Sequence, residues 1–214
     1  MTAKDRIKEL QREVGACQDG VIGNETLTKF AKKFGRTRVQ TIHFFANIHH
    51  ESGGFTLARE NMKDYSPGRI LEIFGIGKHS ANVTRKEAEY LSGKPYELAE
   101  RVYGLGNPRK AKELGNTRPG DGWLFLGGGS LQTTGGRDYM RYGGPELYNN
   151  PDKIGESAYY FTTAIKEFDA KNIWAKAKDL SEASIRAVCL AVNGGYNGLD
   201  DRRAKINYYA SLWK

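Results

Sequence analysis

The segment from Thr37 to Glu51, with the glycine pair that follows it, constrains the fold more than any other part of the chain. Its apolar positions recur at intervals of three and four residues, which predicts one amphipathic helix with a single apolar stripe. The stripe is formed by Val39, Ile42, Phe45, Ala46 and His49. Gly53 and Gly54 can adopt the left-handed conformation that ends a helix. Glu51 is therefore expected at the C-terminal end of this helix.

Helical patterns also dominate the rest of the sequence. Thr84 and Glu87 form a capping box at the start of one segment, and Thr2 is placed to cap the first. The further predicted helices are residues 2–14, 25–34, 68–74, 84–91, 95–103, 157–170, 184–192 and 200–212. Twelve of the 26 glycines lie from Gly104 to Gly144, where we expect irregular backbone without long elements. The pattern predicts a mainly α protein with an N-terminal helical hairpin, residues 1–36, followed by one domain, residues 37–214.

The composition limits the possible partners. The 214 residues carry a formal net charge of +8, which favours polyanions such as nucleic acid, anionic lipid or cell wall. No RNP-type or helix-turn-helix signature is present, so we expect no nucleic-acid partner. No apolar run approaches the roughly 18 residues of a membrane span, and the charged N-terminus lacks the apolar core of a signal peptide. We therefore expect no stable membrane insertion, and we expect the protein to be a monomer. Its two cysteines, Cys17 and Cys189, are expected to be buried thiols or, alternatively, to form one long-range disulfide.

Two glutamates indicate a chemistry. Glu60 follows Glu51 by nine residues, with the glycine pair between them. Glycoside hydrolysis uses two carboxyl groups, one to protonate the leaving oxygen and one to activate water. At the negative end of a helix dipole, and partly buried, Glu51 is expected to keep its proton near neutral pH, as a general acid requires. The alternative is a solvent-exposed or capping glutamate.

The histidines near Glu51 raise the question of a metal. His43 and His50 are seven residues apart and share a helix face, and His49 adjoins His50. The spacing is not His-Glu-x-x-His, and no fourth ligand is evident. We therefore expect packed or hydrogen-bonding histidines, no metal and no cofactor.

The glycine-rich stretch from Gly127 to Gly136 fits the floor of a sugar cleft. It has no Gly-Lys-Ser/Thr and no dinucleotide-binding pattern, so it does not fit a phosphate cradle. A glycine backbone allows a ligand to approach closely, and Gln132 and Thr134 offer hydrogen bonds. A purely structural cluster of turns is the alternative.

Five motifs in order give the chain a resemblance to glycoside hydrolase family 19, in particular to the chitinase-like endolysins of bacteriophages. They are His50-Glu51-Ser52-Gly53-Gly54-Phe55, Glu60-Asn61, Gly120-Asp121-Gly122-Trp123, Leu131-Gln132-Thr133-Thr134-Gly135, and Asn193-Gly194-Gly195-Tyr196-Asn197-Gly198-Leu199 with Arg202. The resemblance covers about residues 37–212. It implies a two-lobed, mostly helical, lysozyme-like fold with a central substrate groove.

The resemblance also implies the roles of single residues. Glu51 would be the general acid and Glu60 the general base of an inverting mechanism, which needs carboxyl groups about 6.5–9.5 Å apart. Gln132 and Thr134 match positions of the cleft floor, where the hydroxyl helps to hold the attacking water. Asn193 and Arg202 match positions that line the groove or support the acid, although Arg203 adjoins Arg202.

The glycine-rich stretch departs from the family pattern Gly-Arg-Gly-hydrophobic-Ile-Gln-Leu-Thr/Ser. Gly128 stands where the family has arginine, Thr133 replaces the leucine, and Ser130-Leu131 replace the hydrophobic pair. An asparagine often found later in this stretch falls near Asp138. One contact with a sugar or a carboxylate is therefore in question, and we expect an active enzyme with altered subsite preference.

The predicted function is that of an endolysin that hydrolyses β-1,4 bonds of bacterial peptidoglycan and lyses the host cell. It would be made in the host cytoplasm and reach the wall through a separately encoded membrane pore. The N-terminal hairpin resembles part of a peptidoglycan-binding module and could bind the wall or only cover the core. A chitinase acting on N-acetylglucosamine polymers, a lytic transglycosylase and a catalytically impaired wall-binding protein are the alternatives.

Overall fold

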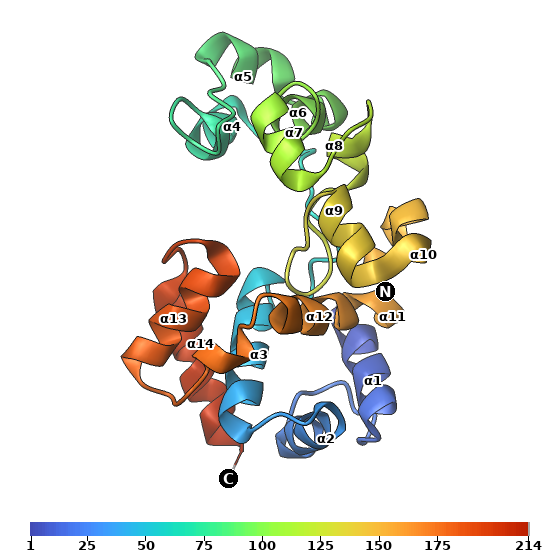
Figure 1. The fold of residues 1–214 in the computed structure, drawn as a ribbon, viewed down its shortest axis with the longest axis vertical. Helices are drawn as coiled ribbons and strands as arrows, with labels where there is room; N and C mark the ends of the chain where they lie inside the picture. The colour runs from blue at the N-terminus through green and yellow to red at the C-terminus, as the bar shows by residue number, and fades with distance from the viewer. Residues whose placement is uncertain (214) are drawn as a thin grey trace. The chain divides into compact units, whose positions relative to one another are not determined.

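The protein is built from helices. The computed structural model describes residues 1–213, apart from the side chain of Ser157, and this part of the chain forms no named β-strand. Figure 1 labels the α-helices. The elements are α1 Ala3–Val14, α2 Asn24–Phe34, α3 Arg38–Glu51, α4 Pro67–Phe74, α5 Arg85–Leu91, α6 Pro95–Val102, α7 Pro108–Leu114, α8 Asp121–Leu124, α9 Gly136–Asp138, the π-helical turn η1 Tyr139–Gly143, α10 Gly144–Asn149, the 3-10 turn η2 Pro151–Gly155, α11 Ser157–Tyr160, α12 Thr162–Ala170, the 3-10 turn η3 Trp174–Lys176, α13 Glu182–Asn193 and α14 Leu199–Leu212. The mainly α fold predicted from the sequence is confirmed.

The chain divides into two compact units. The first comprises Met1–Ala58, Gly129–Leu131 and the chain from Gly155 onward, and the second comprises Arg59–Gly128 and Gln132–Ile154. Each unit has its own cluster of buried apolar side chains. Among residues 1–213, no helix combines the length and the apolar character needed to cross a lipid bilayer.

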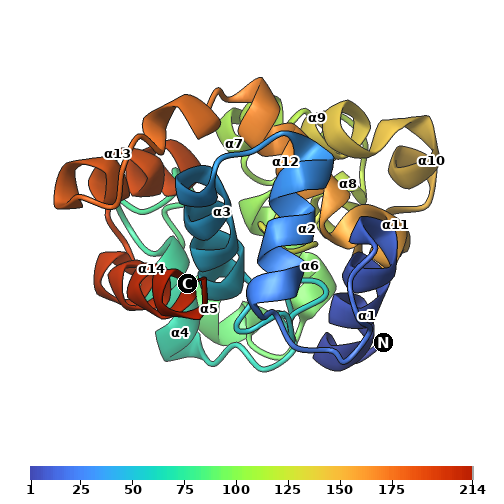
Figure 2. The same ribbon diagram turned by 90° about the horizontal axis from the view of Figure 1, so that it is seen from below.

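Helix α3 is the centre of the first unit. It contacts α2, α13 and α14, and Figure 2 shows it between α2 and α14. The prediction of a single apolar stripe is wrong, because Phe44 and Ile48 lie outside that stripe and are nevertheless fully buried. Phe44 stacks on Phe30 of α2 with ring centroids 5.1 Å apart and meets Phe168 of α12 edge-on at 5.1 Å. A helix packed on several sides has no free polar face, and this is why one stripe could not describe it.

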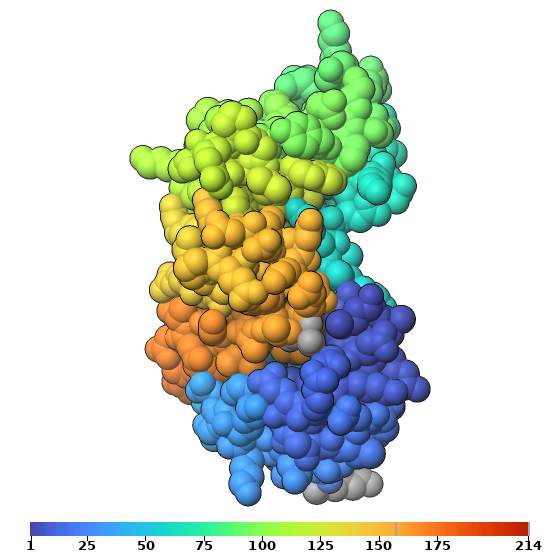
Figure 3. Space-filling model, turned by 90° about the vertical axis from the view of Figure 1, so that its right-hand side faces the viewer, coloured from blue at the N-terminus to red at the C-terminus, as the bar shows by residue number. Residues whose placement is uncertain are grey.

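The N-terminal hairpin belongs to the same core. Leu10 of α1 and Leu27 and Phe30 of α2 are buried in the cluster that contains the α3 side chains. In the space-filling view of Figure 3, α1 and α2 form one continuous surface at the lower end of the drawing. The assignment of residues 1–36 to a separate wall-binding element stays a prediction.

Most helix ends lie within one or two residues of their predicted positions. Thr2 and Thr84 cap their helices and Gly53 and Gly54 have positive φ, as expected, and Thr37 forms a further capping box. The predicted helix over residues 157–170 is interrupted at Phe161. The Thr162 and Thr163 hydroxyls donate to the carbonyl groups four residues before them, at 2.5 and 2.8 Å, and such bonds compete with the helical backbone pattern.

The second unit packs α4 to α6 around Ile70, Phe74, Val83 and Leu98, all buried. The glycine-rich stretch contains short helices and no long element, as expected. Helix α7, which was not predicted, has proline at its first position and Gly115 after its last. Both cysteines are free thiols; Cys189 is buried as expected, whereas Cys17 is exposed.

Candidate active site

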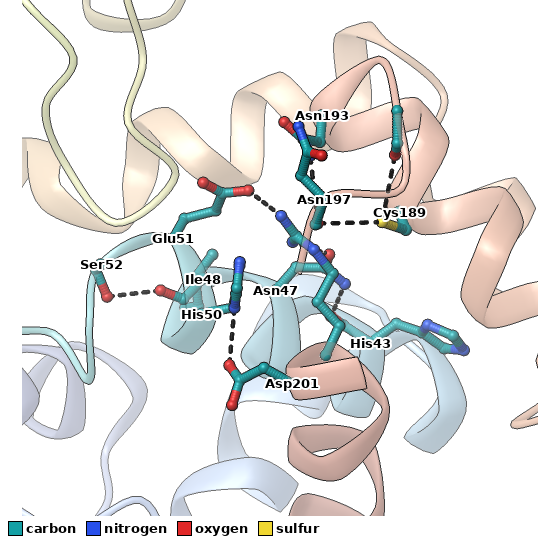
Figure 4. A network of polar contacts seen from close by, with 12 residues as sticks. His43, Asn47, Ile48, His50, Glu51, Ser52, Cys189, Asn193, Asn197 and Asp201 are labelled. Carbon is teal, nitrogen blue, oxygen red and sulfur yellow. Dashed lines mark hydrogen bonds and ion pairs between the residues drawn. The ribbon is translucent and has the colours of Figure 1, made fainter. Parts of the chain in front are cut away.

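Glu51 pairs with a buried arginine. It ends α3 with 21% of its side chain exposed, and its Oε1 accepts a hydrogen bond from Nη2 of Arg202, whose side chain is 1% exposed. The Nη1 atom of Arg202 donates to Oδ1 of Asn47 at 2.5 Å. Asn47 and Glu51 project from the same helix, four residues apart, and so share a face (Figure 4). One guanidinium therefore joins two side chains of α3 to α14.

Arg202, not its neighbour, is the arginine beside Glu51. Arg203 lies on the surface and forms ion pairs with Glu182 and Asp200. A buried guanidinium is strongly unfavourable without partners that accept its hydrogen bonds. Glu51 and Asn47 supply these partners, which explains why α14 is fixed against the end of α3 at this point.

The histidines of α3 have three different partners. His50 Nδ1 lies 2.7 Å from Oδ2 of Asp201, and Figure 4 shows this pair beside Glu51. His49 Nδ1 lies 2.7 Å from the Tyr209 hydroxyl, and His43 Nε2 lies 2.8 Å from the Asp179 carbonyl oxygen. Burial lowers the pKa of His43 and His49. Within residues 1–213, no group of three His, Cys, Asp or Glu side chains is arranged to hold a metal ion.

Asn193 is exposed at the end of α13. Its amide donates to the Asn197 carbonyl oxygen at 3.4 Å, across the loop that Gly194 begins with φ +70°. No hydrogen bond joins Asn193 to Glu51 in this part of the described chain. Of the residues predicted for the site in the first unit, the structure brings together Glu51 and Arg202.

Glu60 belongs to the second unit and is held by the glycine-rich stretch. Its N–H donates to the Gly127 carbonyl oxygen at 2.7 Å, and the preceding residue, Arg59, forms an antiparallel bridge with Gly128. The Glu60 carboxylate accepts hydrogen bonds from the Tyr65 hydroxyl at 3.2 Å, from the Tyr103 hydroxyl and from the Gly127 N–H. Loss of hydration raises the pKa of Glu60, and these hydrogen bonds oppose that rise.

Gln132 and Thr134 lie around the same glycine. A Cβ atom at Gly127 would lie 3.1 Å from the Thr134 hydroxyl oxygen and 3.2 Å from Oε1 of Gln132. Thr134 also donates to the Gln132 carbonyl oxygen at 2.8 Å, and Gln132 adopts a positive φ of 55°. Glu60, Gln132 and Thr134 thus all lie around the backbone of Gly127. A larger residue at position 127 would crowd the side chains of Gln132 and Thr134.

A comparison with known proteins identifies the family. A glycosyl hydrolase family 19 domain-containing protein of Haemophilus influenzae is 32% identical over 172 residues, which cover 77% of this chain and 76% of that protein. The chain belongs to glycoside hydrolase family 19. No family model matches the chain.

Membership of glycoside hydrolase family 19 confirms the resemblance drawn from the five motifs. It agrees with the mainly helical structure in two compact units. The assignment of the roles of Glu51 and Glu60, and of a substrate groove, stays a prediction.

Three residues of the two glutamate sites were not predicted: Asn47, which shares Arg202 with Glu51, and Tyr65 and Tyr103 beside Glu60. Asn47 could have been found from its spacing, because it precedes Glu51 by four residues on the same helix. Tyr65 follows Glu60 by five residues, across a turn in which the Lys63 N–H donates to Oδ1 of Asn61 at 2.9 Å. Tyr103 lies more than 40 residues from Glu60 along the chain, and no local pattern marks it.

Proposed function

We propose that this member of glycoside hydrolase family 19 hydrolyses the β-1,4 glycosidic bonds of bacterial peptidoglycan by an inverting mechanism. Glu51 acts as the general acid and Glu60 as the general base. The observation that carries the proposal is the pair of dissimilar carboxyl sites: one beside the buried Arg202, the other under tyrosine hydroxyls and poorly hydrated. Glycoside hydrolysis uses two carboxyl groups, and the family resemblance gives the acid role to Glu51 and the base role to Glu60.

In this mechanism Glu51 gives its proton to the glycosidic oxygen while the bond to the anomeric carbon breaks. Glu60 removes a proton from a water molecule that attacks the opposite face of the sugar. Hydrolysis then needs Glu60 ionised, and its raised pKa places the acid-side loss of activity at a higher pH than an ordinary glutamate would.

Gln132 and Thr134 would serve the same step. They surround Gly127, whose N–H and carbonyl oxygen both hold Glu60. A hydroxyl and an amide close to the base can hold the attacking water and bind a sugar. Asn193, exposed at the end of α13, is proposed as a further sugar contact.

Peptidoglycan is the preferred substrate because the net charge of +8 favours an anionic wall over neutral chitin. We propose that the protein acts as a phage endolysin, reaching the wall through a separately encoded membrane pore. Residues 1–36 would then add contacts with the wall.

The test compares Glu51→Gln and Glu60→Gln with wild type on purified peptidoglycan and on chitin. Each variant is expected to lose at least a factor of about 10²–10⁴ in hydrolysis, because general acid and general base catalysis each supply that much. Glu89→Gln, at an exposed position on α5, is the matched control and is expected to act like wild type. A Glu51→Gln or Glu60→Gln variant as active as wild type would refute the assignment, and faster cleavage of chitin would make the protein a chitinase.

A further inference from the structure

The carboxylate of Glu60 faces two tyrosine hydroxyls. Tyr65 donates to Oε1 of Glu60 at 3.2 Å, and Tyr103 hydrogen-bonds the same carboxylate from the end of α6. These are the side-chain hydroxyls that the described second unit brings to Glu60. Two O–H donors converge on one poorly hydrated carboxylate, and the proposed mechanism leaves both of them without a role.

We propose that Tyr65 and Tyr103 are positioning residues for the general base, holding the Glu60 carboxylate ionised and in a fixed orientation through their hydroxyl hydrogen bonds. This inference rests on the proposed function, and it identifies the residues that keep the general base, Glu60, ionised and correctly oriented. Neither tyrosine is proposed to touch the reacting atoms.

Both tyrosines remain proton donors throughout the working range of pH. Burial, and then the nearby charge of Glu60, raise the pKa of Tyr65 to about 12. The same two causes raise the pKa of Tyr103 well above its ordinary value. An un-ionised hydroxyl facing a carboxylate donates its proton, and a hydrogen bond to the charged form stabilises that form.

The rings of both tyrosines are held in place by the second unit. The Tyr65 side chain packs against the buried apolar cluster of the second unit, and its carbonyl oxygen accepts a hydrogen bond from the Ser92 hydroxyl at 3.1 Å. The Tyr103 ring meets Phe74 edge-on at 5.7 Å, and its carbonyl oxygen accepts from the Asn116 amide at 3.0 Å. A hydroxyl on a fixed ring can orient a carboxylate, which mobile water cannot do.

The other groups that act on Glu60 are engaged elsewhere. The Arg59 guanidinium pairs with Asp152 and donates to backbone carbonyl groups, including that of Leu124 at 2.7 Å. The Tyr139 hydroxyl donates to the Leu126 carbonyl oxygen at 2.6 Å. The remaining donor, the Gly127 N–H, is part of the backbone. Removal of one tyrosine hydroxyl therefore removes a donor that the engaged side chains of Arg59 and Tyr139 are not placed to replace.

The test uses Tyr65→Phe and Tyr103→Phe, which keep the rings and delete the hydroxyls. Two quantities are measured in the full-length protein: the pH profile of kcat/KM on purified peptidoglycan, and the titration of the Glu60 carboxyl carbon by ¹³C NMR. In each variant, both midpoints should move upward by about one pH unit, because a hydrogen bond to an ionised group is worth that much. Activity should fall about tenfold below the wild-type midpoint and recover at high pH. Tyr90→Phe, at a tyrosine 63% exposed on α5, is the control and should leave both midpoints unchanged.

An equal loss of activity at every pH, with the carboxyl titration unchanged in both variants, would overturn the inference and leave the proposed function standing. A wild-type protein that releases no product would instead refute the proposed function. The ¹³C titration would still decide whether the two hydroxyls stabilise the Glu60 carboxylate.

Discussion

At the scale of single residues, the buried Arg202 guanidinium determines how Glu51 is presented. Its two Nη atoms bond to Glu51 and Asn47, and its side chain is 1% exposed. A buried ion pair of this kind adds little net stability. The loss of one partner nevertheless leaves the other charged group desolvated and unpaired. The contact therefore constrains the position of the predicted acid more than it adds to stability.

Arg202→Met is expected to lower the free energy of unfolding by about 2 kcal/mol, because Glu51 and Asn47 lose their partner while Glu51 keeps partial access to water. The same variant should lose most of its hydrolytic activity through misplacement of Glu51. Equilibrium urea unfolding and product release measure the two effects.

The adjacent Arg203→Met is a matched control. Its ion pairs with Glu182 and Asp200 are exposed, so the change should cost less than about 1 kcal/mol. Equal effects of the two substitutions would show that the Glu51 contact has no special role.

Some of these site residues can be predicted from the sequence and others cannot, for physical reasons. Helix periodicity and the glycine pair place Glu51 at a helix end, because both signals are local. The arginine that meets it is 151 residues away, and the family resemblance pointed to Arg202 without excluding the adjacent Arg203, so that only the structure distinguishes the two. The hydroxyls of Tyr65 and Tyr103 reach Glu60 through tertiary packing, which a single sequence does not encode as a pattern.

At the scale of elements, the turn between α1 and α2 is organised by one buried glutamine. The Gln11 amide donates to Oδ1 of Asp19 at 2.7 Å, the Val21 carbonyl oxygen at 2.9 Å and the Thr26 hydroxyl at 3.0 Å. Its Oε1 accepts from the Gly20 N–H at 2.8 Å. The spacing that resembles a wall-binding module thus has a structural function in this hairpin.

Gln11→Leu is expected to lower the free energy of unfolding by about 2 kcal/mol, since the turn would lose the four hydrogen bonds of this buried amide, one of them to the buried Thr26 hydroxyl. Urea unfolding followed by circular dichroism measures this change. Gln18→Leu, at an exposed position in the same hairpin, should change it by less than about 0.5 kcal/mol. A Gln11→Leu protein as stable as wild type would mean that the turn holds without the glutamine.

Helix starts were predicted better than helix continuity. The capping boxes at Thr37 and Thr84 use side chains three residues apart, so their signal is contained in the sequence. The break at Phe161 depends on which carbonyl groups the hydroxyls of Thr162 and Thr163 reach. The spacing of apolar residues alone does not reveal such a break.

At the scale of the whole molecule, each of the two units is formed by segments that are not continuous in the sequence. Gly129–Leu131 belong to the first unit, although the residues on both sides belong to the second. Leu131 is buried in the core of the first unit, while Gln132 lies by Gly127 in the second. The helical patterns predict a mainly α protein and the family resemblance implies two lobes, but neither predicts that the glycine-rich stretch contributes to both units.

The measurement that tests the central claim most directly is mass spectrometry of the products from purified peptidoglycan digested in ¹⁸O-labelled water. Two-carboxylate hydrolysis predicts reducing muropeptides that carry one ¹⁸O atom, because the attacking water supplies the new hydroxyl group. The labelled sugar then identifies the bond that is cut. Unlabelled anhydro products would mean a transglycosylase that leaves Glu60 without a role as base, and no products with wall binding retained would mean a binding protein; either result would contradict the account.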